Sequence, residues 1–198
     1  MTAGARIIPF RPRPRRPEKM MSNGVLGMLL AVFVEVMLFA GFISGFLIVK
    51  ARAVGSVWPP PDQPRLPFER TAVNTSFLIV SGIVLLIAHR AYQRGNKSVG
   101  PALLVATVLG AAFVAMQGVE WVALLREGLT LTSSLYGSLF YTIIGAHAVH
   151  AVIAIGLLGW AWLRLQSGRL PWEHLSVVAL FWYFVVLIWP FLYFQVYL

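Results

Sequence analysis

The 198-residue chain contains no cysteine, which excludes disulfides, thiolate metal sites, iron–sulfur clusters and thiolate-ligated haem. Charged residues are also scarce, at 12% of the chain, whereas hydrophobic residues make up 59% and the mean hydropathy is +0.77. This composition lies outside the range of soluble domains and inside that of helical membrane proteins. It leaves no room for a separate soluble catalytic domain.

Acidic residues are few. The chain has seven Asp and Glu and sixteen Lys and Arg, which gives a net charge of +9. Six of the basic residues lie in the first 19 positions, where Pro12, Pro14 and Pro17 interrupt the cluster and favour an extended arm. An apolar segment follows directly, so the arm is interpreted as a cytoplasmic anchor near anionic lipid, and no nucleic-acid partner is expected. No short apolar core with a small-residue cleavage site follows the arm. We therefore expect residues 1–21 to be a retained basic cytoplasmic tail and residues 22–198 to form a transmembrane bundle.

Five apolar segments are long enough to cross the hydrocarbon core of a bilayer as helices. They cover residues 24–49, 72–91, 99–125, 136–163 and 175–197. The sequence thus predicts an all-α, polytopic membrane protein with five transmembrane helices. If the N-terminus lies inside, the inner segments carry eleven Lys and Arg and the outer segments five. This bias predicts an N-in, C-out orientation in the inner cell membrane.

A single ionisable group, Glu35, lies near the centre of the first apolar segment. It is 11 residues past Gly24, roughly 16 Å along a helix, which places the carboxyl near the bilayer midplane. A charged group at that depth costs roughly 3 kcal/mol or more unless it is neutralised or partnered. Four interpretations follow: a neutral hydrogen bond to a neighbouring helix, a buried polar network, a lipid headgroup contact or a proton-handling site.

Two other segments carry polar side chains at helical spacing. Gln117 and Glu120 are three residues apart, and so are His147 and His150, so each pair shares one helix face. His150 lies roughly 18 Å from the inner end of its segment, close to the depth of Glu35. We therefore predict that Glu35 bonds to His150 or His147.

The histidine pair is also a candidate for metal or haem ligation. Zinc requires three or four ligands and haem a facing axial ligand. The remaining histidines, His89 and His174, fall near the inner ends of their segments and away from the midplane. The ligand count favours a structural hydrogen-bonding role for the pair, so we expect no metal site in this chain.

Basic and aromatic side chains flank the segments where lipid headgroups would lie. Arg90, Arg94, Arg164 and Arg169 occur beside tryptophans and tyrosines at the expected inner boundary, and Trp58 occurs in the proline-rich first loop at the outer boundary. Basic groups next to aromatic rings bind phospholipid headgroups. We predict that these five residues contact phospholipid.

The order of these motifs resembles subunit III of the haem–copper oxidases, which include cytochrome c and quinol oxidases. The match covers nearly the whole chain after Met28. It is carried by Glu35-Val-Met-Leu-Phe-Ala-Gly-Phe, Trp58-Pro-Pro, Asn74-Thr, Ser81-Gly82, Ala88-His89, Gln117 with Glu120-Trp121, Tyr136-Gly-Ser-Leu-Phe-Tyr and Gly145-Ala-His147-Ala-Val-His150.

The resemblance implies the shorter, five-helix bacterial form of the subunit; in some such systems the catalytic subunit carries two further helices. It implies a non-catalytic subunit that packs on subunit I, alongside subunit II and other subunits, while haem and copper reside in those partners. Bound phospholipid and support of proton uptake and stability are implied as well. Glu35, Glu120, His147 and His150 match the buried polar positions of the family.

The last segment departs from the family pattern at three positions. Tyr183 stands where the family typically has His, Val186 where it has Asp, and Ser176 where it has Glu. Joint loss of these groups indicates that a whole network is absent, since a half-satisfied buried network is worse than an apolar one. The departure leaves open an accessory protein of nitric oxide reductase. A small membrane transporter and a haem-binding membrane cytochrome are the alternatives from other classes.

The charge of the tail generates a first prediction. Replacing its arginines (Arg6, Arg11, Arg13, Arg15 and Arg16) with glutamine should weaken insertion or correct orientation, because the positive-inside bias is lost. The haem content of any partner complex that still assembles should not change. A reporter fused to the C-terminus measures the orientation, and unchanged topology in the substituted chain would show that the arm is dispensable.

Overall fold

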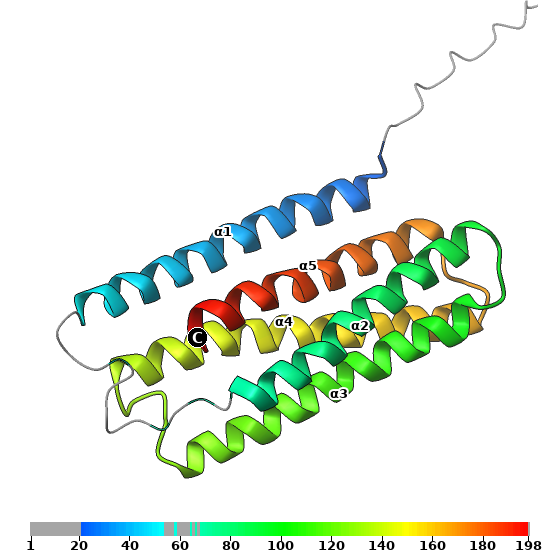
Figure 1. The fold of residues 1–198 in the computed structure, drawn as a ribbon. Helices are drawn as coiled ribbons and strands as arrows, with labels where there is room; N and C mark the ends of the chain where they lie inside the picture. The colour runs from blue at the N-terminus through cyan, green and yellow to red at the C-terminus, as the bar shows by residue number, and fades with distance from the viewer. Residues whose placement is uncertain (1–20, 54–57, 59–63, 65, 67, 198) are drawn as a thin grey trace, which may run out of the picture.

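The computed structural model describes residues 21–53, 58, 64, 66 and 68–197. Residues 1–20 of the predicted cytoplasmic tail lie outside the described residues. The five helices are α1 (Asn23–Arg52), α2 (Phe68–Gln93), α3 (Val99–Arg126), α4 (Leu135–Gln166) and α5 (Trp172–Val196) (Figure 1). All five are long and apolar enough to span a membrane, which confirms the predicted fold class. Most extend a few residues beyond the predicted ends because flanking polar residues continue the helical turns.

Four of the helices form a ring, and the first helix lies outside it. Helix α2 packs on α3, α3 on α4, α4 on α5, and α5 back on α2, whereas α1 packs only on α5 and α4 (Figure 1). Because the chain direction alternates, α1, α3 and α5 begin at one end of the bundle. We call this the N-terminal end and the opposite end the C-terminal end.

Side-chain caps and left-handed glycines set several of the helix limits. The hydroxyls of Ser22 and Ser134 accept hydrogen bonds from the backbone N–H three residues later, at the starts of α1 and α4. Gly95, Gly128 and Gly168 follow the ends of α2, α3 and α4 with φ of 63°, 92° and 66°. Glycine adopts this backbone conformation without the steric cost of a Cβ atom.

Two tryptophans of α5 fill the interior of the ring. Trp182 and Trp189 are seven residues apart, on one face, and both are fully buried. Their indole N–H groups donate to hydroxyls of α2, Trp182 to Ser81 Oγ at 3.1 Å and Trp189 to Thr75 Oγ1 at 2.8 Å. Gly110 of α3 makes room for the first indole, since a Cβ atom there would lie 2.6 Å from the Trp182 ring. The interior therefore combines large rings, small residues and satisfied polar groups.

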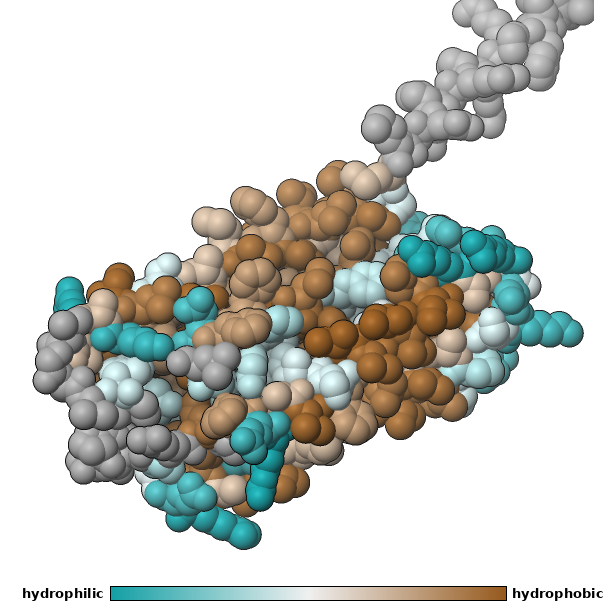
Figure 2. Space-filling view, in the orientation of Figure 1, coloured by the Kyte–Doolittle hydropathy of each residue, from teal (hydrophilic) through white to brown (hydrophobic). Residues whose placement is uncertain are grey.

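The surface has the distribution expected of a membrane-spanning bundle. Figure 2 shows apolar side chains over the middle of the visible face and hydrophilic side chains gathered at the two ends. Helix α1 is the most exposed element, because Phe39 and Phe46 are its only fully buried residues. The N-in orientation remains a prediction.

Close packing of α3 under Trp182 generates a second prediction. Gly110→Ala should destabilise the bundle by about 1–3 kcal/mol, because the new methyl group overlaps the indole ring. Gly118→Ala, on the same helix, is the matched control, since a Cβ atom there meets no atom within 4 Å. Thermal unfolding of the purified variants measures the difference. Equal melting temperatures for the two variants would contradict the packing described.

Candidate functional site

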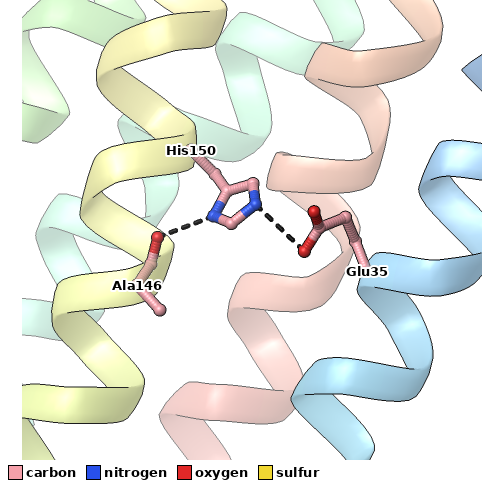
Figure 3. Close-up of polar contacts among 3 residues, drawn as sticks. All are labelled: Glu35, Ala146 and His150. Atoms are coloured by element: carbon pink, nitrogen blue, oxygen red, sulfur yellow. Dashed lines mark hydrogen bonds and ion pairs between the residues drawn. The ribbon is translucent and has the colours of Figure 1, made fainter.

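A carboxyl and a histidine meet between α1 and α4. Glu35 Oε2 of α1 lies 3.1 Å from His150 Nε2 of α4 (Figure 3). The Glu35 side chain is 30% exposed and that of His150 17%, but the Oε2 atom itself is buried. The two atoms are within ion-pair distance, although Oε2 has no partner that meets the geometric criteria of a hydrogen bond. It confirms the pairing predicted from depth and selects His150 as the partner.

The other nitrogen of His150 is held within α4. Nδ1 lies 2.7 Å from the carbonyl oxygen of Ala146, which can only accept a hydrogen bond, so Nδ1 carries a proton (Figure 3). The Nε2 atom is therefore the one that faces Glu35. A proton held between Nε2 and the carboxyl would leave the pair without net charge, which is the state that costs least in an apolar setting.

Aromatic rings surround the pair. Phe39 of α1 and Phe184 and Phe181 of α5 lie 5.6, 6.0 and 6.1 Å from the His150 ring, measured between centroids. Phe39 is fully buried. The pair therefore lies in a low-dielectric environment, where the attraction between its members is stronger than in water.

His147 has a different environment although it is only one turn away from His150. It is 2% exposed, and its ring stacks on Trp189 with a centroid distance of 4.9 Å. Phe39 and Phe113 contact its edges at 6.4 Å. Among the described residues, neither ring nitrogen of His147 has a hydrogen-bond partner. The two histidines, which their spacing places on one helix face, therefore have different surroundings in the structure.

Glu120 belongs to a separate network at the C-terminal end. Its Oε2 atom accepts hydrogen bonds from Thr71 Oγ1 at 2.8 Å and Gln117 Nε2 at 3.2 Å. The same Gln117 amide donates to the Tyr197 hydroxyl at 3.0 Å and accepts from Asn74 Nδ2 at 3.1 Å. The predicted shared face of Gln117 and Glu120 is confirmed. Sequence reasoning missed Tyr197, since it lies 80 residues further along the chain and carries no motif.

The four predicted lipid-contact arginines share one end of the bundle. Arg90 and Arg94 lie where α2 ends, and Arg164 and Arg169 lie where α4 ends, all four exposed at the N-terminal end. The Arg164 guanidinium sits over the Trp160 ring, 5.3 Å from its centroid. Their contact with phospholipid remains a prediction.

Trp58, the fifth predicted lipid contact, packs between two helices at the C-terminal end. Its ring meets Phe46 of α1 at 5.8 Å and Tyr136 of α4 at 5.3 Å, measured between centroids. Trp58 is half-buried there. The indole therefore links α1 to the ring of four helices.

The three positions that depart from the family pattern have packing roles. Ser176 Oγ lies 3.3 Å from His89 Nε2, and Val186 packs on Gly82, where an added Cβ atom would lie 3.0 Å from the valine. The hydroxyl of Tyr183 is buried and has no partner among the described residues. Helix α5 thus contacts α2 through an apolar contact at Gly82 and a polar contact at His89.

The described residues include no group of three or more His, Cys, Asp or Glu arranged to hold a metal ion. Several polar side chains within the bundle bond to other helices, and Glu35 contacts His150 across the interface between α1 and α4. The fold and this site define a multi-pass helical membrane protein whose buried polar groups serve interhelical contacts.

The model of the family described as cytochrome c oxidase subunit III matches residues 17–198. The chain is 32% identical over 179 residues to cytochrome c oxidase subunit 3 of Loxodonta africana and of Rattus norvegicus, and 33% identical to that of Lycodon semicarinatus. Each match covers 86% of this chain and 67% of the relative. The chain belongs to the cytochrome c oxidase subunit III family. This family does not itself carry the redox cofactors of the oxidase.

The different surroundings of the two histidines generate a third prediction. His150→Phe keeps an aromatic ring but leaves the buried Glu35 oxygen unpaired, so it should destabilise the bundle by about 1–3 kcal/mol. His147→Phe removes two nitrogens without partners and should leave stability unchanged or raise it. Thermal unfolding in detergent measures both. Greater damage from His147→Phe than from His150→Phe would contradict the assigned environments.

Proposed function

We propose that this chain acts as the non-catalytic subunit III of a haem–copper terminal oxidase in the inner cell membrane. In this proposal it packs on subunit I, in a complex that also contains subunit II, and its tail faces the cytoplasm. It binds phospholipid and supports proton uptake and stability in its partner, where haem and copper carry out the redox chemistry.

The Glu35–His150 pair carries the proposal. Its two atoms are 3.1 Å apart, so a proton held on either atom would give the pair the same net charge. Aromatic rings pack against the His150 side of the pair and lower the local dielectric constant. The Glu35 carboxyl can bind and release a proton beside His150, which suits it to a supporting role near a proton-uptake path. A carboxamide at the same position cannot bind and release a proton in this way.

The pair also supports a role in assembly. Helix α1 has only Phe39 and Phe46 fully buried, so a large share of its attachment to α4 depends on the polar contact. An oxidase partner needs this helix in a fixed position if it packs against it. The exposed arginines and Trp160 at the N-terminal end support the proposed phospholipid contacts.

Two substitutions of Glu35 test the assembly and proton roles separately. Glu35→Gln keeps the shape and much of the hydrogen bonding, so the chain should still purify with a haem-containing partner, but sustained turnover and proton uptake should fall. Glu35→Ala leaves His150 Nε2 unpaired and should reduce co-purification roughly tenfold. Met37→Ala, a lipid-facing change on the same helix, is the control and should alter neither readout.

The measurements are the haem recovered per subunit in mild detergent and the time course of oxygen consumption. Recovery of the wild-type chain without any haem protein would count against the oxidase assignment. Wild-type turnover and proton uptake in Glu35→Gln would count against the proton role alone.

A further inference from the structure

A cavity of about 220 Å³ opens between α3 and α4, away from the Glu35–His150 pair. Three aromatic rings form much of its wall, those of Phe113 and Trp121 from α3 and Trp189 from α5. Small residues, including Gly118 and Ala148, leave the space between the two helices. The cavity lies in the membrane-spanning part of the bundle.

Two polar groups in the cavity wall lack partners. His147 is 2% exposed, and neither of its ring nitrogens has a hydrogen-bond partner among the described residues. The same holds for the indole N–H of Trp121. The amide of Gln117, which also lines the cavity, is already bonded within the Glu120 network. The unmatched groups are thus an indole donor and an imidazole, which in its neutral form donates one hydrogen bond and accepts one.

Water and a plain hydrocarbon chain both match this cavity poorly. A volume of 220 Å³ corresponds to about seven water molecules, and each buried water typically needs two to four polar partners. Two polar side chains cannot supply them. A saturated acyl chain would fill the apolar space but leave His147 and Trp121 unpaired.

A planar ring that carries an acceptor oxygen satisfies both requirements. An apolar cavity of about 150 Å³ holds benzene, so 220 Å³ accommodates a six-membered ring with substituents. Aromatic walls favour stacked or edge-on contacts with such a ring. A carbonyl oxygen accepts hydrogen bonds and so matches donors on Trp121 and His147.

We propose that this cavity binds the ring of a neutral quinone-type lipid. The ring lies among Phe113, Trp121 and Trp189, a carbonyl oxygen accepts a hydrogen bond from His147 or Trp121, and the apolar tail leaves between α3 and α4 into the bilayer. No redox step is assigned to the ring here. The site is independent of the proposed role of Glu35.

Three variants test the site in the chain purified with its native partners. Gly118→Leu places a side chain at the cavity wall, and its Cβ atom meets nothing within 4 Å. His147→Phe keeps an aromatic ring and removes its hydrogen-bonding atoms. Ala115→Leu is the matched control, because Ala115 is exposed on α3 and does not line the cavity.

The probes are a decyl-substituted benzoquinone and decylbenzene, which has the ring and tail without the oxygens, and native mass spectrometry measures their retention. We expect Gly118→Leu to weaken quinone binding at least about tenfold and His147→Phe about fivefold, with Ala115→Leu unchanged. Decylbenzene should bind wild type about fivefold more weakly than the quinone.

Equal retention of the two probes by wild type would overturn the proposal, because the cavity would then be an apolar groove only. Quinone binding that is unchanged by Gly118→Leu would overturn it as well, since the probe would then occupy a site on another subunit. Haem recovery in the same preparations reports on oxidase assembly, so failure of the quinone site and failure of the oxidase assignment are distinguishable.

Discussion

A hydrocarbon environment offers no hydrogen bonds, so a polar group within this bundle costs least when it has a partner inside the protein. The arrangement of α5 follows from that constraint. Its two buried indoles need acceptors, and Thr75 and Ser81 of α2 provide them at matching heights. Those two bonds fix the rotation of α5 about its own axis, which in turn directs Phe181 and Phe184 toward His150. The environment of the carboxyl–histidine pair therefore depends on hydrogen bonds made on the opposite side of α5.

Helix α1 is held differently from the others. It lies outside the ring and keeps only Phe39 and Phe46 fully buried. Three contacts spread along its length supplement that packing. Glu173 of α5 accepts a hydrogen bond from the Gly24 N–H at 3.3 Å, Glu35 meets His150 in the middle, and Trp58 packs against the far end. Two of the three are polar, so the position of α1 depends on polar contacts as well as on apolar packing.

Much of this arrangement could be predicted from the sequence. Five long apolar runs predicted the five helices. Counting residues along these runs predicted that Glu35 and His150 lie at a similar depth in the membrane. Depth, however, does not give the direction of a side chain around its helix. His147 is at a similar depth, yet it turns toward Trp189 and away from Glu35. Tyr197 could not be foreseen as a partner of Gln117, because nothing local links residues 80 positions apart.

The contact between α5 and α2 gives a physical reason for valine at position 186. Val186 lies against Gly82, close enough that an added Cβ atom on the glycine would be 3.0 Å from it. An aspartate at position 186 would bring a carboxylate into this tight apolar contact and would need a buried partner. The hydroxyl of Tyr183 already lacks one among the described residues. With valine in place, α2 and α5 pack closely without such a partner, and Ser176 can still reach His89 at 3.3 Å. Close packing at Gly82 therefore joins α5 to α2 on this side, whereas Glu35 and His150 form a polar contact between α1 and α4.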